Sequence, residues 1–258
     1  MPEVLSVAVS GLGMMTIAVF AVVFWRRVSR VGMRWFWVGA GLWTVAVALK
    51  FTCAALTNEI VLNCLKGLSH PLYVASGGLF IGVQSSAFEM GFTLLAVLIW
   101  HQLGRDAGRA IAIGVGAGAF EAFLLGLAAL VGGLTLTFAQ GPEVEEALKG
   151  LEQTASVTPH LWLIGTVERI IAILCHASSR ALILLGVTQK KHLLILWGFL
   201  IFTLLDGIAG GVHVAGWIGK FSMWWVELTL LPFALVSIPI LVWCSKRLRE
   251  PLNTAESA

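Results

Sequence analysis

Seven apolar segments dominate the sequence and restrict its fold more than any other feature. They lie at about residues 4–24, 34–55, 72–100, 109–133, 161–187, 193–213 and 223–244. Each can cross the hydrocarbon core of a bilayer, which takes roughly 20 helical residues. Backbone polar groups inside lipid must pair internally, and long continuous segments achieve this as helices. The sequence therefore predicts an all-α, polytopic membrane bundle of about seven transmembrane helices.

The composition supports a membrane protein with one domain. Hydrophobic residues make up 58% of the chain and charged residues 12%, whereas a soluble domain has about 25% charged residues. We expect a single transmembrane domain over residues 1–250 and a short cytoplasmic tail over residues 251–258. A stretch of the longest loop, beginning at Pro142, has a short amphipathic helical pattern.

Basic residues in the loops predict the orientation. The first segment has no basic residue before it, which favours an uncleaved anchor whose N-terminus is outside and places the C-terminus inside. Eleven basic residues then fall on the inner side and three on the outer side: Arg26, Arg27, Arg30, Arg34, Arg105, Arg109, Lys190, Lys191, Lys246, Arg247 and Arg249 against Lys66, Lys149 and Lys220. The net charge of +3 records this orientation and requires no nucleic acid partner. We expect a multi-pass protein of a prokaryotic cell membrane.

Charged side chains inside the predicted spans are the candidates for function. A charge near the bilayer centre costs several kcal/mol unless it is paired or hydrated. Those well inside the spans are Glu89, Glu121, Glu168, Arg169, Arg180 and Asp206, and His176 lies among them. Lys50 and Glu227 fall nearer the predicted ends, where snorkelling toward the interface would accommodate them.

The fifth predicted span carries four of these side chains on one polar wedge. At 100° per residue, Arg169 and His176 lie within about 20° of each other, and Arg180 is about 40° from His176. Glu168 widens this face. The wedge should point into the bundle, where Arg169 and Arg180 would neutralise carboxylates of neighbouring helices.

The polar residues also lie at similar depths. A rise of 1.5 Å per residue places Glu121 and His176 near the midplane, with Glu89 and Asp206 slightly displaced. Four helices would thus contribute to one buried centre. Carboxylates with an imidazole suit a divalent metal ion, and zinc is the ion expected for hydrolysis. His213, seven residues after Asp206, is a spare ligand.

Three stretches of the sequence resemble a known family. They are "GAGAFEAFLLG" around Glu121, "VERIIAILCHASSRALILLG" around His176 and "FTLLDGIAGG" around Asp206. In this order they resemble the YhfC family of intramembrane metalloproteases, which is distantly similar to CAAX-processing membrane proteases. The resemblance covers residues 1–250. It implies a metal-dependent peptidase that acts in the lipid bilayer on a membrane-embedded or membrane-proximal peptide.

The resemblance also implies roles for individual residues. Glu121 and His176 would be the leading metal or catalytic positions, with Asp206 as a further metal ligand. Glu89 and Glu168 would be additional catalytic carboxylates. The two arginines of the fifth span, Arg169 and Arg180, would support the site.

The sequence departs from the family pattern at two places. The family has His-x3-Asp in the span of the last acid, but Phe202 precedes Asp206 here. It also has EExxR in the third span, where this chain offers Glu89 followed by Met90 and Thr93. Either the site recruits another residue, such as Glu89 or His213, or this member has lost catalysis.

Two other functions use the same sequence features. A proton- or cation-coupled transporter would use the intramembrane carboxylates as a relay or ion site. A seven-helix photoreceptor would need a lysine in its last span for a Schiff base. Residues 223–244 contain no lysine, which argues against a retinal protein.

Overall fold

The computed structural model describes residues 2–247, and its regular elements are all helices. The helices are α1 (Pro2–Ser29), α2 (Arg34–Leu65), α3 (His70–Ile99), η1 (His101–Gly104), α4 (Ala107–Phe138), α5 (Pro142–Val157), α6 (Leu161–Thr188), α7 (His192–Val214) and α8 (Trp224–Arg247). The predicted tail at residues 251–258 lies outside the described residues.

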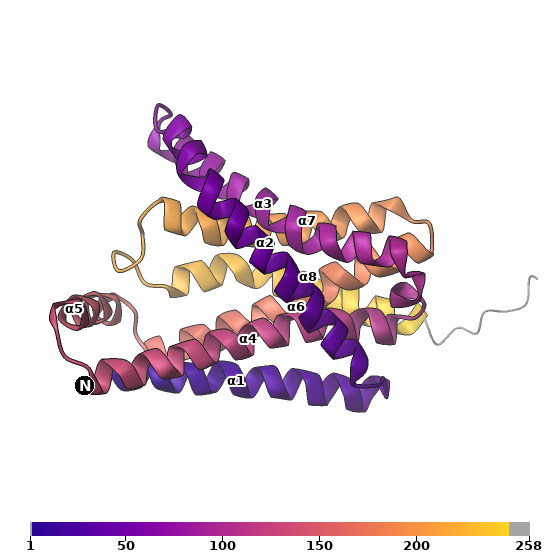
Figure 1. The fold of residues 1–258 in the computed structure, drawn as a ribbon, viewed down its shortest axis with the longest axis horizontal. Coiled ribbons are helices and arrows are strands. Elements are labelled where there is room, and N and C mark those ends of the chain that lie inside the picture. Colours follow the sequence, from indigo (N-terminus) through magenta and orange to yellow (C-terminus); the bar gives the residue numbers. More distant parts are fainter. Residues whose placement is uncertain (1, 248–258) are drawn as a thin grey trace, which may run out of the picture.

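The helical bundle confirms the predicted fold class. Seven helices are long and apolar enough to cross a membrane, namely α1, α2, α3, α4, α6, α7 and α8. Helix α5 is the amphipathic helix that the sequence predicts from Pro142. It caps one end of the bundle (Figure 1).

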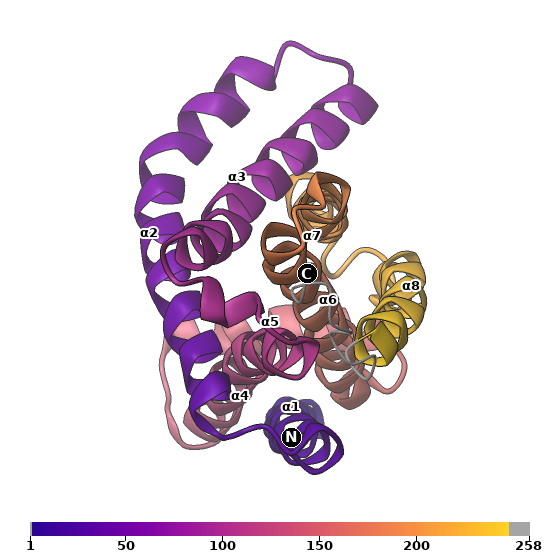
Figure 2. The same ribbon diagram turned by 90° about the vertical axis from the view of Figure 1, so that its right-hand side faces the viewer.

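Helix α6 forms the centre of the bundle. In its most apolar 18-residue window, 83% of the residues are buried, against 11–44% for the other six spans. Helices α1, α4, α7 and α8 pack around it, as the end-on view in Figure 2 shows. The polar face predicted for this span therefore contacts protein rather than lipid.

Glycines bring the helix backbones close together. A Cβ atom at Gly82 of α3 would lie 2.2 Å from the carbonyl oxygen of Thr203 on α7. A Cβ atom at Gly114 of α4 would lie 2.6 Å from the Cα atom of Ala177 on α6. The backbones of α3 and α7, and those of α4 and α6, therefore lie close together, as small residues at helix interfaces allow.

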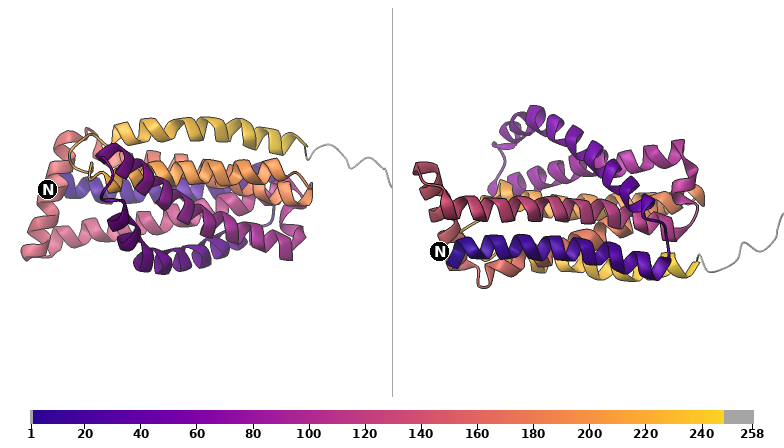
Figure 3. Two further views of the ribbon diagram at one scale, coloured as in Figure 1. Left: turned by 90° about the horizontal axis from the view of Figure 1, so that it is seen from above. Right: turned by 60° about the horizontal axis from the view of Figure 1, so that its bottom comes forward.

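The outer halves of α2 and α3 form a hairpin that leaves the bundle. From residue 48 to Leu65, α2 has no buried residue. Figures 1 and 3 show this hairpin projecting away from α4 and α1. Charged groups near the middle of α2 and α4 consequently keep some exposure.

Candidate metal centre

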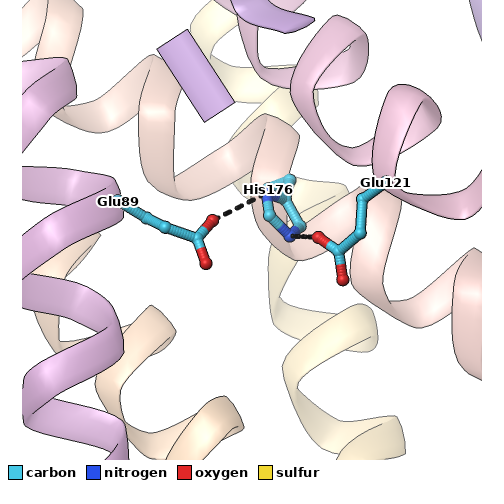
Figure 4. Close-up of side chains that lie close together, drawn as sticks. All are labelled: Glu89, Glu121 and His176. Atoms are coloured by element: carbon cyan, nitrogen blue, oxygen red, sulfur yellow. Dashed lines mark ion pairs between the residues drawn. The ribbon is translucent and has the colours of Figure 1, made fainter. Parts of the chain in front are cut away.

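Glu89, Glu121 and His176 meet between three helices, α3, α4 and α6 (Figure 4). One potential ligand atom from each lies within 4.8 Å of the others. The Nε2 atom of His176 is 2.9 Å from Oε2 of Glu121, and its Nδ1 atom is 4.0 Å from Oε2 of Glu89. Two carboxylates and an imidazole from distant parts of the chain thus share one small volume.

Close packing between α4 and α6 positions two of these groups. A Cβ atom at Gly118 would lie 3.0 Å from the Cβ atom of His176. Glu121 follows Gly118 by three residues, so its side chain lies on nearly the same face, about one turn along α4. The glycine therefore lets the carboxylate reach the imidazole.

Two cations hold the Glu89 carboxylate. Lys50 Nζ is 2.7 Å from Oε1, and Arg180 Nη2 is 3.1 Å from Oε2. Both Arg180 and Glu89 are buried. Arg180 therefore neutralises a carboxylate of a neighbouring helix, as the helical wheel predicted.

The interfacial position predicted for Lys50 is wrong. Its ammonium group points inward to Glu89 and Ser85. The predicted span ended near residue 55, but α2 continues to Leu65, so Lys50 lies at the middle of the helix. The turns of α2 after residue 55 include Asn58, Glu59 and Asn63, so hydropathy alone did not show that the helix continues.

The Glu121 carboxylate has its own partners. Arg169 Nη1 is 2.7 Å from Oε1, and the indole Nε1 of Trp43 donates a hydrogen bond of 3.0 Å to Oε2. Arg169 also contacts Glu168, whose side chain is 41% exposed. Sequence reasoning missed Trp43, because nothing in its spacing distinguishes it from the other tryptophans.

Asp206 is joined to the centre through a serine. The Ser85 hydroxyl contacts both the Asp206 carboxylate and, at 3.4 Å, Oε1 of Glu89. Phe202 is buried and meets His176 edge-on, with ring centroids 4.9 Å apart. His213 is exposed in the last turn of α7 and does not join the cluster.

Both ring nitrogens of His176 have close partners. Arg180 Nη1 contacts Nδ1, and a guanidinium can only donate. Nδ1 is thus the acceptor in this contact, and Nε2 lies 2.9 Å from Oε2 of Glu121. Both nitrogens of the imidazole are thus engaged.

The summed formal charge of the cluster is negative. With all groups ionised, the four carboxylates (Glu89, Glu121, Glu168 and Asp206) and the three cations (Lys50, Arg169 and Arg180) give 3 − 4 = −1. Buried charge is costly unless it is compensated. An added anion would increase the existing excess, so the cluster favours a cation over an anion.

The donor set fits a divalent metal ion. Catalytic zinc sites use three nitrogen or oxygen ligands and keep one position open. Glu89, Glu121 and His176 offer this number and type of donors at close range. Glu89, Glu121 and His176 would hold such an ion, which would supply a Lewis acid at this point of the bundle.

Comparison with protein families agrees with this donor set. A sequence model described as YhfC intramembrane metalloprotease matches residues 13–230. The chain belongs to the YhfC family. The match covers every helix that contributes to the centre, and it confirms the resemblance seen in the three motifs. Searches of curated proteins and of solved structures found no match.

Membership of the YhfC family, with seven apolar helices, identifies an integral, multi-pass membrane protein of a metalloprotease family. The family implies a metal ion and a substrate within the membrane. The Glu89, Glu121 and His176 cluster is the candidate site in the part of the chain that the structure describes.

Proposed function

We propose that this YhfC protein is an intramembrane metal-dependent peptidase whose active site is the Glu89, Glu121 and His176 cluster. One observation carries the proposal. Three ligand atoms from three helices converge within 4.8 Å midway along the bundle. Intramembrane ionisable residues that are buried and mutually paired are typical of functional sites.

The metal would be held by His176, Glu89 and Glu121, with zinc as the proposed ion. When bound, zinc supplies Lewis acidity that polarises a carbonyl group and acidifies water. Asp206 would support this set through Ser85 rather than bind the ion directly, since Ser85 stands between it and Glu89.

Glu121 is the carboxylate best placed to accept a proton from the attacking water. Its side chain is 20% exposed, whereas that of Glu89 is 2% exposed. Arg169 occupies one lone pair of Oε1, and each carboxylate oxygen has a second lone pair that can accept from water. Glu168 and Arg169 would serve as positioning residues, because Glu168 holds the guanidinium that fixes Glu121.

The substrate would be a membrane-embedded or membrane-proximal peptide. Lys50 and Glu121 both keep about one fifth of their side-chain exposure, near the level where the α2–α3 hairpin leaves the bundle. A peptide backbone approaching from that side would meet Glu121 before Glu89. We propose a prokaryotic cell membrane as its location, with the N-terminus outside.

A second candidate function, proton- or cation-coupled transport, is favoured by the continuity of the polar contacts. Ion pairs and hydrogen bonds connect Glu168 to Asp206 through Arg169, Glu121, His176, Arg180, Glu89 and Ser85. Chains of carboxylates and histidines of this kind relay protons in transporters.

Reconstitution in liposomes tests both functions on one sample. A panel of fluorescently labelled single-span peptides is incorporated with the protein, and cleavage is followed with zinc or with a chelator. A peptidase gives zinc-dependent cleavage that is lost in Glu121→Gln and kept in Glu59→Gln, an exposed carboxylate of α2. Proton flux that depends on Glu121 without any cleavage would favour the transporter instead.

A further inference from the structure

Helices α3 and α7 separate toward the end of the bundle where α6 ends, and a groove opens between them. Their backbones are in contact at Gly82, where a Cβ atom would lie 2.2 Å from the carbonyl oxygen of Thr203. One turn further along α3, the Ser86 hydroxyl donates a hydrogen bond of 3.3 Å to the carbonyl oxygen of Phe199. Beyond this contact lies a groove of about 750 Å³. This volume falls within the roughly 300–1,000 Å³ of ordinary ligand sites.

The walls of this groove are apolar, and they open toward lipid. They are formed by Leu94 and Leu98 of α3, Val187 of α6, and Ile195, Leu196 and Phe199 of α7. Leu98 and Leu196 are both more than half exposed. None of the wall residues belongs to the metal centre. Because the walls carry no charge and face the bilayer, an acyl chain is the kind of group that they can bury.

One end of the groove is basic. His101, Lys190 and His192 line it, and all three are exposed. No aspartate or glutamate occurs within residues 90–105 or 181–205, the segments that form this end. The groove therefore lacks a carboxylate of its own that would neutralise Lys190, and its charge is complementary to an anion.

Two tryptophans place the basic end at the membrane surface. Trp100 directly precedes His101, and Trp197 lies in the second turn of α7. Both are exposed, and exposed tryptophans of membrane helices typically lie at the headgroup level. The groove thus joins an apolar length within the hydrocarbon to a cationic end at the headgroups. Basic pockets between transmembrane helices bind anionic headgroups.

We propose that this groove binds an anionic phospholipid such as phosphatidylglycerol. The Lys190 ammonium would donate to the phosphate, and His101 and His192 each offer a ring N–H to the headgroup oxygens. An acyl chain would lie against Leu98 and Leu196. A choline headgroup carries a positive charge beside the same phosphate, and Lys190 would repel it. Net charge thus selects an anionic phospholipid over a zwitterionic one.

Competition between two lipids tests the proposal. The full-length protein in detergent is mixed with equimolar phosphatidylglycerol and phosphatidylcholine, and the bound lipids are counted by native mass spectrometry. Wild type should retain phosphatidylglycerol about fivefold over phosphatidylcholine, the effect expected of one basic residue at a charged headgroup. Lys190→Gln should lose this preference, and Lys190→Arg should keep it.

Two further variants separate the groove from the surrounding surface. Lys191→Gln is the matched control, since it removes the same charge from the adjacent side chain, which does not line the groove. It should keep the preference. Leu98→Trp narrows the groove and keeps every charge, and it should lose most of the bound lipid. Each variant should keep the wild-type Tm in lipid-free detergent, which shows that it is folded.

Four results would overturn the proposal. The first two are equal retention of both lipids by wild type and an unchanged amount of bound lipid in Leu98→Trp. The third is an equal effect of Lys190→Gln and Lys191→Gln, since loosely attracted lipids respond only to the total charge of the surface. The fourth is displacement of phosphatidylglycerol by inorganic phosphate, because the ligand would then be a free phosphate. Zinc content should be unchanged in Lys190→Gln, which separates this groove from the proposed peptidase site.

Discussion

At the scale of single residues, Phe202 determines how many nitrogen donors surround the proposed metal. Its ring lies edge-on to His176, and the Arg180 guanidinium lies 5.7 Å from its centroid. The family resemblance implies a histidine at this position. The aromatic ring packs against His176 and offers no lone pair to a metal ion.

Phe202→His should therefore increase the affinity for zinc. A second imidazole from α7 would face His176, and we expect at least about a tenfold gain, the smallest effect usual for residues around a metal. Competition against a zinc-binding dye in detergent measures it. Phe138→His, at the exposed end of α4, is the matched control and should change nothing. An unchanged affinity in Phe202→His would place the ion elsewhere.

Some site residues could be predicted from the sequence, and others could not. The face shared by Arg169, His176 and Arg180 follows from helical periodicity alone. Trp43 reaches the site where α2 crosses α4, and Lys50 reaches it where α2 packs against α3; no local pattern encodes either contact. The burial of Glu227 was missed for a similar reason, since it depends on how α8 packs against the rest of the bundle.

At the scale of helices, the contact between α2 and α4 sets the position of the Glu121 side chain. A Cβ atom at Gly39 would lie 1.9 Å from the carbonyl oxygen of Ile113. Trp43, one turn further along α2, donates to Glu121. The backbone approach at Gly39 therefore places the indole that holds the carboxylate.

Gly39→Ala should destabilise the protein. The added methyl group would force α2 away from the α4 backbone, and overpacking of this kind costs roughly 1–3 kcal/mol. Thermal unfolding in detergent should show a lower Tm for this variant, with weaker zinc retention. Gly41→Ala is the matched control, because a Cβ atom there meets nothing within 4 Å. Equal Tm values for the two variants would contradict this packing.

The helices themselves were the most predictable part of the fold. Lipid requires internal backbone pairing, so each apolar segment had to become a helix. Hydropathy did not define the end of α2, since its last turns are polar enough to resemble a loop. The departure of the α2–α3 hairpin from the bundle likewise depends on tertiary packing.

At the scale of the whole molecule, the arginine distribution predicts the orientation in the membrane. Cys64 lies exposed near the end of α2, while Cys175 and Cys244 are buried. With the N-terminus outside, Cys64 should be on the outer side. A membrane-impermeant maleimide should label it on intact cells, and Cys64→Ser should remove the label. Labelling of Cys64 only after permeabilisation would reverse the orientation.

The central claim is that Glu89, Glu121 and His176 hold a metal ion, and zinc content tests it most directly. The protein is purified in detergent, exposed briefly to zinc, freed of unbound ion and measured by elemental analysis. We predict about one zinc per chain for wild type and for Glu59→Gln, as in catalytic zinc sites, and none for His176→Ala or Glu121→Gln. Absence of zinc from the wild type, or full retention in His176→Ala, would contradict the metal centre.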